Sequence, residues 1–364
     1  AKKAYIYIMK DVNLNSTITV PGGVDITIST TDFTWDGTQP QAYDKSSGNI
    51  TVNREPGFNG TMFQIASGSA GNTALTFSSV TVDGGSSSTS TGPILDAEAG
   101  SFKTEIGGIL QNNYINADAS NTNANMASAV QIGAGANVSM NNGTVTGNRA
   151  IQGSAVNCLG SSGTFRIENS VRITGNTASM GTADTADDTN ANVYLAAGRT
   201  ITVDKGILDD TSSIGVNVQD PPTTDTAERI VATTTQGTLP YSAANFTADK
   251  SGNWTQMASD QKSVALKATI FTMTVNYVSA IDGVTAVHAA SSEQKSAGSS
   301  IDMTPVQANG WIYDSAVITG TGLAADANGR IRGTMPNSDA VVTYRYNLNQ
   351  AVYRFDTAGG LAVD

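Results

Sequence analysis

Hydrophobic and polar residues alternate along this chain in short runs that end at Gly, Ser or Asn. An alternation with a period of two predicts β-strands with one buried face and one exposed face. Residues 164–173 are an example, and an earlier segment has the same order of strand, turn and strand. Phe165 follows Val138 by 27 residues, and Asn176 follows Asn148 by 28 residues. Self-similar units at this spacing indicate a repeat protein.

The repeats predict an all-β fold, specifically a parallel β-helix. A coil this thin cannot bury its inward aliphatic side chains alone, so it must stack on neighbouring coils with strand above strand. Asn at the turns tolerates a left-handed backbone, and stacked Asn side chains can hydrogen-bond along the axis. An immunoglobulin-like sandwich also contains short strands, but it does not produce self-similar units at this period.

The pattern divides the chain into four parts. Residues 1–225 carry the repeats and are expected to form the β-helix. Residues 226–267 are expected to form a terminal rung, a cap and a linker, because the end of a repeat stack needs a cover. A clean alternating strand at residues 271–278 opens an independent module over residues 268–350. Residues 351–364 are expected to be a tail.

Two family resemblances cover nearly the whole chain. The first part resembles the pectate-lyase-like right-handed β-helix of large surface proteins of Gram-positive bacteria. This resemblance rests on the segments Ile18 to Gly23, Ile173 to Ala178 and Asn192 to Ile201. Residues 268–347 resemble the β-grasp-like modules of the mucin-binding-protein and internalin B-repeat type, through Thr274-Val275-Asn276-Tyr277 and the closing unit Gly333 to Tyr346. The resemblances imply a right-handed parallel β-helix followed by a small β-grasp-like module, and a role in adhesion or surface display.

Composition limits the partners. Only 14% of the residues are charged and the formal net charge is −11, with no concentrated run of Lys or Arg. We therefore expect no nucleic-acid partner and no binding to an anionic membrane. The single cysteine, Cys158, cannot form an internal disulfide, and we expect it to be a small buried hydrophobe. We expect a monomer.

The chain opens without a signal-peptide pattern, and it has no apolar run long enough to span a bilayer. We expect it to be an excised part of a longer extracellular protein, either secreted or anchored to a cell wall.

Enzymatic chemistry is the main rival to binding, because many β-helices are polysaccharide lyases or glycoside hydrolases. Such a hydrolase needs carboxylates at acid and base separation. No pair of acidic residues recurs with a nearby Arg or Lys in a recognisable motif, so we predict no catalytic residues and no cofactor. The candidate carboxylates are Asp83, Asp96, Glu98, Glu105 and Glu168.

Other candidate sites are weaker. The acidic loop with Asp184, Asp187 and Asp188 offers oxygen ligands that suit Ca²⁺, but it lacks a calcium-binding repeat and reads equally as a solvated loop. The single histidine, His288, has no second His or Cys nearby for a metal.

Aromatic residues are candidate platforms for stacking sugars, although packing into the core or cap is the favoured alternative. These residues are Trp35, Trp254, Trp311 and Tyr313. A Lys and an Asn at the two ends of a Gram-positive surface module can also form an isopeptide bond, and Lys267 and Asn347 occupy those positions.

The sequence leaves three functions open. The favoured one is a non-catalytic extracellular adhesin or display protein that binds host or environmental glycans or glycoproteins. The alternatives are a polysaccharide lyase or glycoside hydrolase of the β-helix class, and a purely structural surface stalk.

Overall fold

The structure is a computed structural model of the 364-residue chain. It describes residues 1–30, 34–35, 40–41, 50–68, 71–86, 90–115, 126–151, 154–159, 162–179, 189–203, 208–234, 236, 240–250, 252–320 and 322–349. The expected tail, residues 351–364, lies outside this part of the chain.

The chain divides into two compact units. Unit 1 comprises Ala1–Pro222 and Thr226–Lys267, and unit 2 comprises Thr223–Asp225 and Ala268–Asp364. The division between Lys267 and Ala268 lies where the sequence pattern changes. Within the described ranges the secondary structure is β-strand apart from one short 3-10 helix, η3 (Ala243–Asn245), so the all-β prediction is confirmed.

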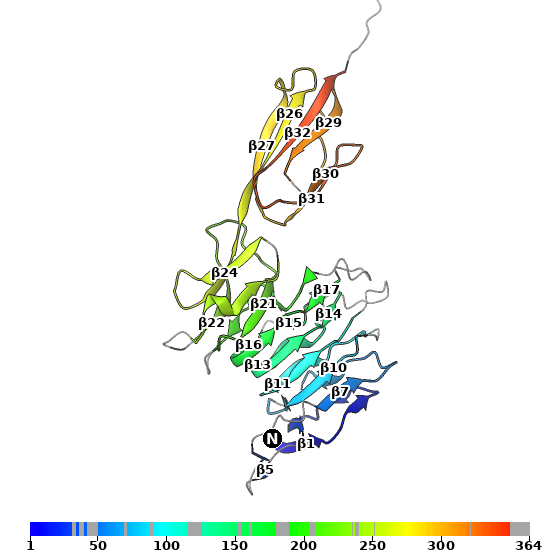
Figure 1. Ribbon diagram of the computed structural model, residues 1–364, viewed down its shortest axis with the longest axis vertical. Helices are drawn as coiled ribbons and strands as arrows, with labels where there is room; N and C mark the ends of the chain where they lie inside the picture. Colours follow the sequence, from blue (N-terminus) through cyan, green and yellow to red (C-terminus); the bar gives the residue numbers. More distant parts are fainter. Residues whose placement is uncertain are drawn as a thin grey trace, which may run out of the picture. The chain divides into compact units, whose positions relative to one another are not determined.

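Unit 1 is built on three ladders of parallel strands, and the chain visits the ladders in turn. One pass through all three ladders is called a coil here. The first and longest ladder contains, in order, β1 (Lys2–Ile8), β4 (Val24–Thr30), β9 (Ala74–Ser78), part of β11 (Leu95–Thr104), part of β13 (Val130–Thr146), part of β16 (Thr164–Ile173), β20 (Ile201–Thr202) and β22 (Arg229–Thr233). Figure 1 shows β11, β13 and β16 side by side.

The second ladder contains β2 (Val12–Leu14), β7 (Ile50–Arg54), β10 (Val80–Asp83), β12 (Ile109–Gln111), the later parts of β13 and β16, β21 (Ser213–Val218) and β23 (Phe246–Ala248). The third ladder contains β3 (Ile18–Thr19), β8 (Phe63–Ile65), the first parts of β11 and β13, β15 (Val156–Cys158), β19 (Val193–Leu195) and the end of β21.

The ladders confirm the repeat spacing. Val138 of β13 pairs in register with Phe165 of β16. Side chains that point inward at equal positions form continuous apolar columns, because each strand sits directly over the same strand of the neighbouring coil. One column contains Leu75, Phe102, Val138, Phe165 and Ile201, all of them buried.

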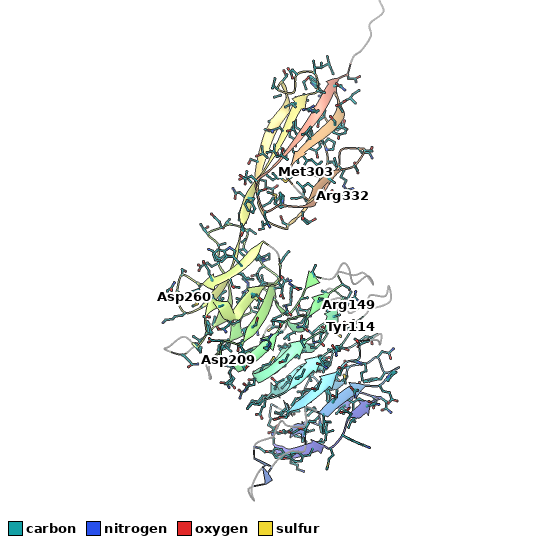
Figure 2. All side chains as sticks on the ribbon, in the orientation of Figure 1. Tyr114, Arg149, Asp209, Asp260, Met303 and Arg332 are labelled. Carbon is teal, nitrogen blue, oxygen red and sulfur yellow. The ribbon has the colours of Figure 1, made fainter. Side chains whose placement is uncertain are left out.

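Smaller elements complete unit 1. A short sheet of β14 (Arg149–Ala150), β17 (Thr177–Ala178) and β18 (Thr189–Asn190) lies beside the ladders, and an isolated bridge joins Tyr114 to Arg149 next to it (Figure 2). The hairpin β5 (Thr34–Trp35) and β6 (Pro40–Gln41) is separate. At the C-terminal end, β24 (Asn253–Met257) is followed by β25 (Val264–Ala268), which pairs antiparallel with β22.

An asparagine ladder runs along the stack in the segments that connect the second parallel ladder to the third. It consists of Asn113, Asn148, Asn176 and Asn192. The backbone N–H of each of the first three residues donates to the side-chain oxygen of the next, at 3.0, 3.0 and 3.1 Å. The side-chain Nδ2 of Asn148 also donates to Asn176 at 2.9 Å, which confirms that Asn side chains stack along the axis.

The ends of the asparagine ladder are charged. Arg54 donates to Asn113 Oδ1 at 3.1 Å, and Asn192 donates to Asp249 through its backbone N–H and its Nδ2, at 2.7 and 2.6 Å. The hydrogen bonds that join successive members of the ladder therefore run in one direction, from the cationic donor Arg54 to the anionic acceptor Asp249. A Cβ atom built at Gly215 would lie 2.2 Å from Asn192 Nδ2, so this close approach requires glycine.

Unit 2 is a four-stranded sheet with a small second sheet. The larger sheet has the order β27 (Ala286–Ser296), β26 (Ile270–Ser279), β32 (Ala340–Leu348) and β29 (Trp311–Thr319), and β26 pairs parallel with β32. The smaller sheet has the order β28 (Ser300–Met303), β31 (Ile331–Thr334) and β30 (Leu323–Ala325). One face of the larger sheet carries the buried core of this unit, which includes Val275, Val342 and Tyr344.

Candidate functional site

The outward side of the first ladder carries a row of polar side chains, here called the long face. Residues at equal register positions point to the same side of the ladder. Adjacent strands lie about 4.8 Å apart, so the row spans roughly 30 Å. Its members are half-buried or exposed, and they are Tyr5, Thr27, Thr76, Lys103, Ser139, Arg166, Thr202 and Thr233.

Most side chains of the long face carry a hydroxyl group, and two of them, Lys103 and Arg166, are cationic. Lys103 pairs with Glu105 at 2.9 Å, and both side chains are about two-fifths exposed. In a neighbouring row, Thr164 Oγ1 donates to Asn137 Oδ1 at 2.8 Å. Hydroxyls donate and accept hydrogen bonds, while Lys and Arg only donate. Such a row matches a ligand with many hydroxyl or carboxylate oxygens.

Asp96 has the most perturbed environment of the five candidate carboxylates. It points outward from the third ladder, between Gln64 and Gln131 of the neighbouring strands. Burial raises the pKa of the Asp96 carboxyl to about 6, and the negative charge of Glu98 also contributes. Glu98 accepts a hydrogen bond from the Ser67 backbone at 2.8 Å. A carboxyl that keeps its proton near pH 6 can serve as a general acid.

The other candidate carboxylates have different surroundings. Asp83 accepts bonds from the backbone of Gly85 and from the side chains of Gln111 and Asn112, all at 2.8 Å. These contacts stabilise a turn. Glu105 belongs to the ion pair with Lys103, and Glu168 lies half-buried in register with Asn141.

Two of the candidate aromatic platforms, Trp311 and Tyr313, pack against other side chains of the protein. Tyr313 packs edge-to-face against Tyr344 and Tyr346, with ring centroids 6.1 and 6.3 Å apart, and Trp311 packs against the same core. An open platform at Trp311 and Tyr313 is therefore not supported. The backbone of Trp35 pairs in the β5–β6 hairpin, but its side chain lies outside the described part.

Two other aromatic rings are accessible. Trp254 on β24 is 46% exposed. Tyr5 lies on the long face and stacks on Tyr7, with ring centroids 6.5 Å apart and the rings within 10° of parallel.

Metal binding finds no support in the described residues, which contain no group of three or more His, Cys, Asp or Glu side chains placed to hold an ion. The calcium candidates Asp184, Asp187 and Asp188 lie outside the described residues. His288 is exposed and lies edge-on to the ring of Tyr277, 5.1 Å away.

The two candidate residues for an isopeptide bond, Lys267 and Asn347, lie in different units. Lys267 Nζ donates to the Thr226 carbonyl oxygen at 3.0 Å and lies 4.0 Å from Glu228. Asn347 Nδ2 donates to Asp314 at 2.8 Å. Each residue is engaged by neighbours in its own unit, so the arrangement gives this cross-link no support.

Sequence reasoning missed Arg54, which is buried and donates to backbone carbonyls as well as to Asn113. Its acceptors include the carbonyl oxygens of Gly84 at 3.0 Å and of Phe58 at 3.3 Å. Burial lowers the pKa of Arg54 to about 10. The sequence did indicate that Arg54 is buried, because Arg54 continues an alternating run of residues in which Val52 points inward.

The described residues include no helix of the length and apolarity needed to cross a membrane. Comparison of the chain with protein-family models, with curated protein sequences and with solved structures finds no match.

Proposed function

We propose that unit 1 is a right-handed parallel β-helix and that unit 2 is a β-grasp-like module. The first proposal is supported by three parallel ladders that the chain visits in a fixed order. The second is supported by the parallel pairing of β26, the first strand of the larger sheet, with β32, its last strand.

We infer that the protein is a non-catalytic extracellular adhesin or display protein, and that the long face is its glycan-binding surface. The observation that carries this inference is the continuous row of hydroxyl and cationic side chains on one ladder. A rigid scaffold holds these groups at a constant spacing. Binding of a polymeric ligand therefore costs little conformational entropy of the protein. Affinity then comes from many weak polar contacts rather than from a deep pocket.

A glycan and matrix-protein array tests this function directly. We expect the protein to bind at least one class of acidic or hydroxyl-rich glycan. Arg166→Ser should weaken that binding by at least about tenfold, the equivalent of one lost hydrogen bond to a charged group. Arg172→Ser is the matched control, because Arg172 lies on the same strand but points outward from the second ladder. Equal loss in both variants would place binding elsewhere, and no binding at all would favour a structural stalk.

Glycoside hydrolysis is the second candidate, and the raised pKa of Asp96 beside Glu98 favours it. In this account Asp96 donates a proton to the leaving oxygen while Glu98 acts as the partner carboxylate. The test is release of reducing sugar from pectins and mucin glycans. Turnover that disappears in Asp96→Asn, but persists in Glu105→Gln, would establish the enzyme and displace the adhesin.

A further inference from the structure

The larger sheet of unit 2 ends at β27, a strand whose side chains are mostly exposed. Within the residues that the structure describes, β27 pairs with β26 and with no other strand, and Figure 1 shows it at the margin of the sheet. Eight of its eleven residues are exposed, and its middle consists of the small residues Ala289, Ala290, Ser291 and Ser292. An exposed strand edge with small side chains leaves its backbone accessible to another strand.

The outer edge of β27 is regular over Ser291–Ser296 only, which is called the edge segment here. The register with β26 shifts on both sides of Tyr277, whereas the six pairs from Ile270↔Ser296 to Val275↔Ser291 follow one another without interruption. A bulge disrupts the local ladder and increases the twist of the strand. A partner strand therefore meets a regular template in the edge segment alone.

The direction of the backbone groups in the edge segment follows from one hydrogen bond. The Ala297 N–H donates to the Thr269 carbonyl oxygen at 2.9 Å. The N–H and C=O groups of an antiparallel strand alternate between its two edges. Odd-numbered residues therefore bond to β26, and even-numbered residues direct their groups to the open edge. These are Ser292, Gln294 and Ser296, and of their groups the Ser296 carbonyl oxygen already accepts from the Ser299 N–H at 3.0 Å.

A second copy of the edge segment fits this geometry. In a two-fold symmetric antiparallel pair, the open-edge groups face each other only if the axis passes through an even-numbered residue. With the axis at Gln294, the two Gln294 residues exchange both backbone hydrogen bonds, and each Ser296 N–H donates to the Ser292 carbonyl oxygen of the other copy. An axis at Ser292 would extend into the bulge. An axis at Ser296 would need Gly298, whose N–H already donates to the Met335 carbonyl oxygen at 2.8 Å.

The same register pairs opposite charges. Glu293 and Lys295 lie on one face of β27, with their charged groups 2.7 Å apart. With the axis at Gln294, each Glu293 lies directly opposite Lys295 of the second copy. These are non-hydrogen-bonded pairs, in which side chains approach most closely. The other edge strand of the sheet, β29, has Asp314 as its only charged residue, so two copies of β29 offer no such match.

We propose that unit 2 forms a two-fold symmetric dimer through antiparallel pairing of β27 with β27 of a second copy, centred on Gln294. This dimer differs from the monomer expected from the sequence, and it does not depend on the glycan-binding function. The interface is short and polar, so the dimer is weak, with a dissociation constant between about 1 µM and 1 mM. Pairing covers the open edge of β27 in both copies, so association through this edge stops at two.

Charge reversal in the full chain tests the register, with sedimentation equilibrium at concentrations up to about 1 mM as the measurement. Glu293→Lys places lysines opposite each other, and Lys295→Glu places glutamates opposite each other. Each variant alone should therefore self-associate at least about tenfold more weakly than the unmodified protein. An equimolar mixture of the two variants restores opposite charges in both pairs, and it should form a heterodimer at least as tight as the unmodified dimer.

A backbone variant tests the pairing independently of charge. Gln294→Pro removes an N–H that points away from β26, so it should abolish the dimer and leave the far-ultraviolet circular dichroism unchanged. Lys250→Glu makes the same change of charge at an exposed lysine of unit 1 and should leave self-association unchanged. A protein that stays monomeric at about 1 mM would overturn the proposal. So would charge variants that each associate as tightly as the unmodified protein, or a mixture that associates no better than either variant alone.

Discussion

The two ends of unit 1 have the same kind of core but different covers. At the C-terminal end, β25 pairs antiparallel with β22, and Val264 and Leu266 of β25 are buried, as is Phe246 of β23. At the N-terminal end, Ile6 occupies the position that is buried in every following coil of its column. The residue types are alike, so the difference in burial comes from the number of neighbouring coils. Stability in such a stack is a property of interfaces between coils.

The largest expected effect comes from deleting an aromatic ring in the interior. Phe77 is fully buried and contacts Phe63 and Phe102, with ring centroids 5.0 and 5.3 Å away. Phe77→Ala should lower the free energy of unfolding by roughly 3–5 kcal/mol. Ile6→Ala lies in the same column at the open end and should cost about 1 kcal/mol or less. Urea denaturation measures both, and equal losses would remove the distinction between interior and end.

A smaller effect is expected from breaking the asparagine ladder. Asn176 is fully buried, and its Oδ1 accepts from the backbone N–H and the Nδ2 of Asn148. Asn176→Ala leaves the buried backbone N–H of Asn148 without its acceptor and removes the hydrogen bonds that Asn176 Nδ2 donates to the carbonyl oxygens of Val145 and Thr174, at a cost of roughly 2–3 kcal/mol. Asn137→Ala, on the exposed side of the first ladder, should cost less than about 0.5 kcal/mol. If Asn176→Ala leaves the free energy of unfolding unchanged, the asparagine ladder does not stabilise the stack.

The covered end should also respond to pH. Burial raises the pKa of Asp249 to about 6, as it does for the half-buried Asp96 on the third ladder. A carboxyl whose pKa is raised on folding binds protons more readily in the folded state, so stability increases as the pH falls from 7 to 5. Each carboxyl should contribute on the order of 1 kcal/mol over this range. Thermal melts of Asp249→Asn and Asp96→Asn should show a flatter dependence on pH than the unmodified protein, and an unchanged slope would contradict this assignment.

The smallest effect is expected on the long face. Lys103→Ser removes an ion pair between partly exposed side chains and should change stability by less than about 1 kcal/mol. Its effect on glycan binding should be larger than its effect on melting, because the long face contributes little to the core. A large drop in melting temperature would show that this ion pair is structural.

The sequence predicted the parts of this fold that repeat. The spacing from Val138 to Phe165 became a register pair, and the stacking of Asn148 on Asn176 became a pair of hydrogen bonds. Such features can be predicted from the sequence because each coil repeats the same pattern of residue types.

Contacts that occur once were not predictable in this way. Asn192 and Asp249 are 57 residues apart, and no repeat links them. The residues of the long face were not predicted, since its rows depend on the register of every coil. For Trp311 and Tyr313 the sequence left both core packing and a sugar platform open, because it does not show which face of a strand the core covers.

The central claim is that each coil is stabilised by the coils on both sides of it, and amide hydrogen exchange of the unmodified protein measures this most directly. Protection should be weakest in β1, β2 and β3, strongest in β11, β13 and β16, and still substantial in β22 and β23 beneath the covered end. If β1 exchanges as slowly as β13, or β22 as fast as β1, the claim is wrong.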